Sequence, residues 1–144
     1  MIDIDRCLRE YAGFFENLVP EDLDRFDQVF SPDARFKDPF NDVHGVEAIR
    51  RVFEHMYTQC SDPRFTVSDY CGRGDRGYLS WCFSFTRKSG LETVSLEGLS
   101  RVSFDDHGRV LEHIDYWDPA EQVYARLPVI GWIIGMIRSR LSAR

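Results

Sequence analysis

Four segments between residues 65 and 117 alternate apolar and polar residues, with the period of two that is typical of β-strands. They run from Phe65 to Cys71, from Tyr78 to Arg87, from Thr93 to Phe104 and from Val110 to Trp117. Short turns separate them, among them the hairpin turn expected at Lys88-Ser89-Gly90. Because strands joined by hairpins pair with their neighbours, this part of the chain predicts a single meandering antiparallel sheet.

The first third of the chain has the spacing of amphipathic helices instead. The apolar positions of the first expected helix are Ile4, Leu8, Tyr11, Phe15 and Leu18. A second, short helix is expected from Pro20 to Phe30, where Ser31-Pro32-Asp33 stops it, and a third from Val46 to Tyr57. Helices followed by a strand meander predict an α+β fold, with the helices packed on one face of the sheet.

A carboxylate occupies an unusual position between the second and third helices. The stretch from Ala34 to Pro39 alternates, which places Asp38 on the same face as Phe36 and two basic residues on the other face. If the basic residues face water, Asp38 faces the apolar interior, where desolvation would raise its pKa toward that of a useful general base. The alternative is that Asp38 only caps the turn that Pro39 begins.

The composition limits the classes of partner. At 144 residues, the chain fits one domain, and its eleven Phe residues suit either a cavity lined by rings or an aromatic core. The net charge of −6, without a basic stripe, argues against nucleic-acid binding. Neither the four cysteines nor the four histidines have metal-site spacing, so we expect no metal and no cofactor. The charged residues among the first twenty argue against a signal peptide, so we expect a cytoplasmic protein.

The tail is the least ordinary segment. Asp118-Pro119-Ala120-Glu121 has the pattern of a helix cap, and a helix is expected from there to Leu127, where Pro128 breaks it. The following stretch, Val129 to Ile137, is apolar nearly all round and precedes several arginines. We therefore expect its side chains to be buried against another surface. It could close the pocket as a lid, pair with a second copy through Gly131 and Gly135, or make a peripheral membrane contact over residues 129–144.

Three strings, in this order along the chain, resemble the nuclear transport factor 2-like superfamily. That superfamily includes ketosteroid isomerases and SnoaL-type polyketide cyclases. The strings are Asp22-Leu23-Asp24 through Ala34, Phe36-Lys37-Asp38-Pro39 followed by Gly45 to Ile49, and Gly108-Arg109-Val110 through Trp117. The resemblance covers residues 3–118 and implies a cone-shaped half-barrel. Its strongly curved, mixed or antiparallel sheet would pack on the N-terminal helices and enclose an apolar cavity, and the protein would often be a homodimer. We therefore expect a domain over residues 1–118, with residues 119–144 as its C-terminal helical extension.

The resemblance also suggests roles for individual residues. By similarity to ketosteroid isomerase, Asp38 would be the base and Tyr11 an oxyanion donor, but Ser100 stands where that family has a second acidic donor. Asp115 is similar to a water-activating Asp of limonene-epoxide hydrolase; Glu97 and Arg101 lie nearby in the pattern. Each residue also has a structural alternative: Tyr11 as a core tyrosine, and Asp115 as an acid paired with an arginine or with His113. The pocket residues expected from these patterns are Phe15, Phe36, Phe53, Ser100, His113 and Trp117.

Two functions therefore stand. One is acid/base chemistry without a cofactor (isomerisation, cyclisation or hydrolysis) on an apolar, lipid-, steroid- or polyketide-like molecule, with Asp38, Tyr11 and Asp115 as catalytic residues. The other is a non-catalytic ligand-binding pocket or a dimerising accessory subunit, which the serine at position 100 favours.

Overall fold

The computed structural model describes residues 1–88, 90 and 92–143, so Ser89 of the expected hairpin turn lies outside the described residues. Its helices are α1 (Ile4–Glu16), α2 (Phe26–Val29), α3 (Val46–Gln59), α4 (Pro119–Gln122) and α5 (Pro128–Leu141), with 3₁₀ turns η1 (Pro20–Arg25) and η2 (Tyr124–Arg126). Its strands are β1 (Phe30–Lys37), β2 (Asp42–His44), β3 (Cys60–Arg73), β4 (Arg76–Arg87), β5 (Thr93–Phe104) and β6 (Val110–Tyr116). The α+β class and the extra C-terminal helix are therefore confirmed.

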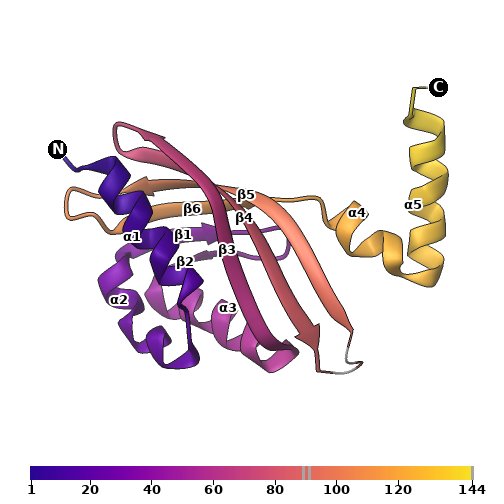
Figure 1. Cartoon of the computed structure of the whole chain (residues 1–144), viewed down its shortest axis with the longest axis horizontal. Coiled ribbons are helices and arrows are strands. Elements are labelled where there is room, and N and C mark those ends of the chain that lie inside the picture. The colour runs from indigo at the N-terminus through magenta and orange to yellow at the C-terminus, as the bar shows by residue number, and fades with distance from the viewer. Residues whose placement is uncertain (89, 91, 144) are drawn as a thin grey trace.

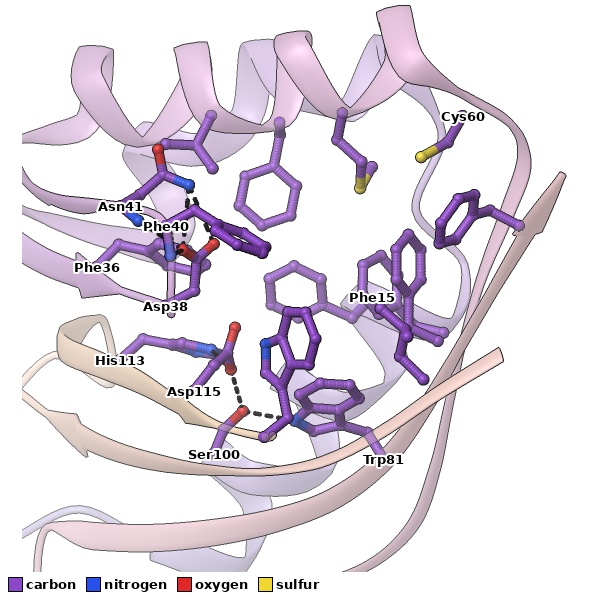
Figure 2. Close-up of a pocket in the computed structure, with 18 of the residues that line it drawn as sticks. Phe15, Phe36, Asp38, Phe40, Asn41, Cys60, Trp81, Ser100, His113 and Asp115 are labelled. Carbon is purple, nitrogen blue, oxygen red and sulfur yellow. Dashed lines mark hydrogen bonds and ion pairs between the residues drawn. The ribbon is translucent and has the colours of Figure 1, made fainter. Parts of the chain in front are cut away.

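The strands form one mixed sheet in the order β2-β1-β6-β5-β4-β3. The long strands β3, β4, β5 and β6 pair antiparallel, as the alternation predicts, whereas β1 lies parallel to β6. This pairing places the first strand of the chain beside the last one and so brings the segment before Asp38 next to Asp115. The sheet bends around α3 (Figure 1), and a cavity lies between its concave face and the helices (Figure 2).

Aromatic side chains from the helices and β1 pack together beside the cavity. Tyr11 and Phe15 of α1, Phe26 and Phe30 after it, and Phe53 of α3 are all at most 9% exposed. Their rings meet edge to face or tilted at centroid distances of 4.9–6.1 Å, the arrangement that aromatic quadrupoles favour. The Phe-rich composition therefore supplies both a packed core and, farther along the same face, the wall of a cavity.

The strand before Asp38 differs from its sequence-based prediction at both ends. β1 begins at Phe30 and includes Pro32. The pairing of β1 with β6 is irregular between Phe30 and Arg35, around this proline. A proline is tolerated there, since a missing N–H removes no regular ladder bond. The strand ends at Lys37, so the prediction that Asp38 projects from a strand is wrong, and Asp38 lies in the following loop.

The tail helix begins where predicted, after the Asp118 cap, but α4 ends at Gln122 rather than at Leu127. Pro128 does not break a helix but is the first residue of α5, where its missing N–H costs nothing. In Figure 1, α5 projects beyond the end of the sheet, and its main contact in the described chain is with η2. Most of its apolar side chains are exposed, and none of them lines the cavity described below. Among the described residues, no helix has both the length and the apolar character needed to cross a membrane.

Candidate functional site

A cavity of about 390 Å³ lies between α1, α3 and the concave face of the sheet. That volume falls within the range of small-molecule sites. All nine residues that the sequence suggested for the site line it: Tyr11, Phe15, Phe36, Asp38, Phe53, Ser100, His113, Asp115 and Trp117. Apolar side chains form most of the remaining wall, including the stacked rings of Phe65 and Phe83. Such a wall excludes water and favours an apolar ligand.

The polar groups of the cavity form a continuous hydrogen-bonded chain from α1 to β4. The Tyr11 hydroxyl lies 2.7 Å from His113 Nδ1, and His113 Nε2 lies 2.6 Å from Asp115 Oδ1. Ser100 Oγ lies 2.5 Å from the same carboxylate oxygen, and the Trp81 indole N–H donates to Ser100 Oγ over 2.8 Å. Residues 102 positions apart are joined in this way at the centre of the fold.

The direction of these bonds follows from Asp115. An ionised carboxylate only accepts, so His113 Nε2 and the Ser100 hydroxyl both donate to it. His113 Nδ1 then accepts a hydrogen bond from the Tyr11 hydroxyl. Burial, and secondarily the charge of Asp115, raises the pKa of Tyr11 well above its ordinary value of 10.0, so this phenol remains a donor. Each hydrogen bond in this polar network is therefore donated in the direction of Asp115.

The Asp115 side chain has one oxygen that is bonded and one that is available. Oδ1 accepts both hydrogen bonds, while Figure 2 shows the other oxygen directed into the cavity. The side chain is 17% exposed, and its charge is held at the boundary between the polar chain and the apolar wall. This is the geometry of a positioned acid or base: fixed on one side and open to a ligand on the other.

The strands explain this placement. Ser100 of β5 pairs with Asp115 of β6, and His113 lies two positions before Asp115 on the same face of β6, so all three side chains line the cavity. Across β6, Phe36 of β1 stacks on the His113 imidazole at 4.7 Å and 15°. The ring stack fixes the plane of the imidazole and so the direction in which its Nε2 donates.

Asp38 lies at the same cavity, but its carboxylate is occupied by its own loop. Oδ1 accepts from the backbone N–H groups of Phe40 and Asn41 at 2.8 and 2.7 Å, and the Asn41 side-chain amide donates to both oxygens. This is the turn-capping arrangement that sequence analysis gave as the alternative for Asp38. Because both carboxylate oxygens are engaged by Asn41 and the loop backbone, neither is left free toward the cavity.

The other sequence-based expectations have mixed outcomes. The pairing of Asp115 with His113 is present, whereas Arg101 pairs with Glu112 and the side chain of Glu97 is not part of the Asp115 chain. Sequence reasoning missed Trp81, although its alternation with Leu79, Phe83 and Phe85 placed it on one face of a strand. Its N–H needs a partner when half-buried, which was the available signal.

The described residues contain no group of three or more His, Cys, Asp or Glu side chains placed to hold a metal ion. All four cysteines are free thiols.

Comparison with known proteins assigns the fold to a family. The model of the SnoaL-like domain matches residues 11–113, so the chain belongs to the SnoaL-like domain family. No curated protein matches the chain significantly.

Solved structures support the same fold. An NTF2-like protein of unknown function from Burkholderia pseudomallei K96243 is 21% identical, with a TM-score of 0.72 over 85% of this chain and 96% of that one. A ketosteroid isomerase-like fold protein from Catenulispora acidiphila DSM 44928, solved with trimethylamine, is 15% identical (TM-score 0.71, 88% and 95% covered). A protein from Shewanella putrefaciens CN-32 described as a SnoaL-like polyketide cyclase is also 15% identical (TM-score 0.70, 85% and 97% covered). At these identities the likeness concerns the fold alone.

Proposed function

We propose that the chain binds a small apolar molecule in this cavity and that Asp115 transfers a proton to or from it without a cofactor. One observation carries the proposal: Asp115 Oδ1 is fixed by Ser100 and His113, while its other oxygen faces an apolar cavity. A base held in this way needs little reorganisation when a carbon acid is placed beside it. Isomerisation and cyclisation of polyketide-like or steroid-like ketones both begin with such a proton transfer.

In this proposal the remaining polar residues position Asp115. Ser100 and His113 hold one carboxylate oxygen by charge-assisted hydrogen bonds, and Tyr11 fixes the imidazole through Nδ1. The reacting proton would move from the ligand carbon to the free oxygen of Asp115. It would return to a second carbon, or to the ligand oxygen, before product leaves.

The proton transfer can be tested without knowing the natural substrate. Small bicyclic ketones such as 2-tetralone exchange their α-protons in D₂O when a base is placed beside them, and NMR follows the loss of signal. We expect the wild type to accelerate this exchange relative to Asp115→Asn, by about 100-fold or more if general-base catalysis operates. Asp38→Asn is the matched control, because it removes a carboxylate from the same cavity, and it should retain most of the rate. Equal rates for the wild type and Asp115→Asn would refute the role of Asp115.

The second candidate is a pocket that binds its ligand without reaction. It is favoured because the Asp38 carboxylate and the Tyr11 hydroxyl, the two groups for which the isomerase resemblance predicted chemistry, already have hydrogen-bond partners within the protein. Saturable binding of 2-tetralone, measured by quenching of Trp81 and Trp117 fluorescence, with no exchange above background would support this candidate instead.

A further inference from the structure

The C-terminal helix α5 leaves a broad apolar surface uncovered. Val129, Trp132 and Leu141 are 70%, 67% and 80% exposed, and Ile133 and Ile137 are 46% and 52% exposed. At about 100° per residue, the apolar side chains from Trp132 round to Ile134 cover an arc of roughly 200°, and Arg140, in the last turn of the helix, lies within this arc. The opposite side carries the small residues Gly131 and Gly135, and Arg138. An exposed surface of this kind marks an interaction site.

The small-residue side of α5 is already used within the chain. A Cβ atom at Gly131 would overlap the backbone carbonyl of Ala125 in η2, so glycine is required for the helix to approach that turn. The same glycine is therefore committed to packing inside the chain. It is not free to form the close helix–helix contact that the Gly131-x-x-x-Gly135 spacing would otherwise suggest. The apolar arc, by contrast, points away from the body of the protein.

Charge distinguishes this segment from the rest of the molecule. Residues 122–144 contain four arginines and none of the chain's 24 acidic residues, so their net charge is +4. The preceding 121 residues carry a net charge of −10, which together with the tail gives the total of −6. The positive charge of the tail favours an anionic surface as its partner.

We propose that α5 docks on the surface of a membrane that contains anionic lipids. The 14 residues of α5 extend about 21 Å, less than the hydrocarbon thickness of about 30 Å, so the helix would lie along the interface rather than span it. Trp132 suits the headgroup region, and the apolar arc would enter the boundary of the acyl chains. Arg140 would reach lipid phosphates from within the apolar arc, with its aliphatic stem along the neighbouring apolar side chains, and Arg138 would add positive charge from the opposite side of the same turn.

The segment that joins the sheet to α5, formed by α4 and η2, lies beside the cavity. The Gln122 side chain is held by the backbone N–H and C=O of Glu97 at 2.7 and 3.0 Å, and the Phe40 ring contacts both Trp117 and Tyr124. Docking of α5 would therefore bring the cavity, which Trp117 and Phe40 line, close to the lipid layer. The consequence that apolar ligands enter from the bilayer rests on the proposed function; the docking itself does not.

Vesicle flotation of the full chain tests the docking in the absence of any ligand. We expect the protein to float with vesicles of phosphatidylcholine mixed with phosphatidylglycerol, and more weakly with phosphatidylcholine alone or at high salt. Ile133→Asp combined with Ile137→Asp should reduce binding to the anionic vesicles by about tenfold or more. Leu111→Asp is the matched control, because Leu111 is 43% exposed on β6, and it should bind like the wild type.

The charge contribution has its own matched pair. Arg138→Glu with Arg140→Glu should weaken binding to anionic vesicles by about tenfold or more, whereas Arg9→Glu with Arg51→Glu, which makes the same change at exposed positions elsewhere, should weaken it much less. All of these positions are exposed, so circular dichroism should show unchanged folding. The proposal is overturned if the wild type does not float with anionic vesicles, or if the α5 variants float equally well. A dimer in light scattering that the Ile133/Ile137 variant dissociates, without flotation, would assign the helix to a second copy instead.

Discussion

Replacement of Ser100 by alanine tests the polar chain most sharply. The Ser100 side chain is 1% exposed, accepts a hydrogen bond from the Trp81 indole at 2.8 Å and donates one to Asp115 at 2.5 Å. A neutral hydrogen bond contributes about 1 kcal/mol to stability, and one to a charged group about 1.5–3 kcal/mol. Because alanine leaves both partners in place without a replacement, we expect Ser100→Ala to lower the free energy of unfolding by about 2–4 kcal/mol.

Ser31→Ala is the matched control. Ser31 is also buried, at 4% exposure, but its hydroxyl is the one buried side-chain polar atom among the described residues without a hydrogen-bond partner. Removing this hydroxyl should lower the free energy of unfolding by no more than about 0.5 kcal/mol, and could raise it by up to about 1 kcal/mol. Urea unfolding followed by tryptophan fluorescence measures the free energy of unfolding of both variants. In thermal unfolding, the midpoint temperature of Ser100→Ala should fall by about 10 °C relative to the wild type. If Ser100→Ala costs no more than Ser31→Ala, the polar chain does not contribute as described.

Three further predictions concern the surroundings of the site. The raised pKa of Tyr11 means that its contribution to stability is complete below the unfolded value near pH 10 and is lost as the pH rises from there toward the folded value. The stability difference between the wild type and Tyr11→Phe should therefore shrink above that pH, by up to about 1.4 kcal/mol per unit in urea titrations; a constant difference would contradict it. Gly98→Ala should destabilise the fold by about 1–3 kcal/mol, because a Cβ atom would overlap the Trp81 ring, whereas Gly13→Ala, in open space within α1, should stabilise it by about 0.5–1 kcal/mol in the same assay. Burial raises the pKa of the Cys60 thiol at the cavity wall, so iodoacetamide should modify it more slowly than the exposed Cys71, and 2-tetralone should slow Cys60 alone in peptide mass spectra; equal rates at both would contradict this.

Local patterns in the sequence were sufficient for the elements and for the wall of the cavity. Ser100 was singled out by the resemblance to ketosteroid isomerase. The three-to-four spacing through Tyr11 and Phe15 placed both on the buried face of α1, and alternation placed His113 and Asp115 on one face of the last strand. These predictions depend only on the periods of helices and strands, which are local properties. The family resemblance implied a curved sheet packed on the N-terminal helices, and the SnoaL-like match confirms the family.

The distribution of roles within the site could not be obtained from those patterns. The strand before Asp38 was expected to continue, because alternation alone does not show that Asn41 and the loop backbone supply donors to its carboxylate. The bond from Tyr11 to His113 depends on how α1 crosses the sheet, which is a tertiary property. The tail helix was predicted to run to Leu127 because Pro128 was expected to end it, but α4 ends at Gln122 and Pro128 begins α5, since proline begins a helix as readily as it ends one.

The central claim is that the charged carboxylate of Asp115 forms the polar end of an apolar cavity that binds small molecules. Two ligands of the same shape test it directly: 2-naphthoate, which is anionic at neutral pH, and 2-acetylnaphthalene, which is neutral. By fluorescence titration, Asp115→Asn should bind 2-naphthoate more tightly than the wild type by about tenfold or more, because it removes a like charge from a water-poor site, while the affinity for 2-acetylnaphthalene should change little. Asp38→Asn should alter neither affinity strongly. Equal naphthoate affinities for the wild type and Asp115→Asn, or a gain confined to Asp38→Asn, would contradict the account.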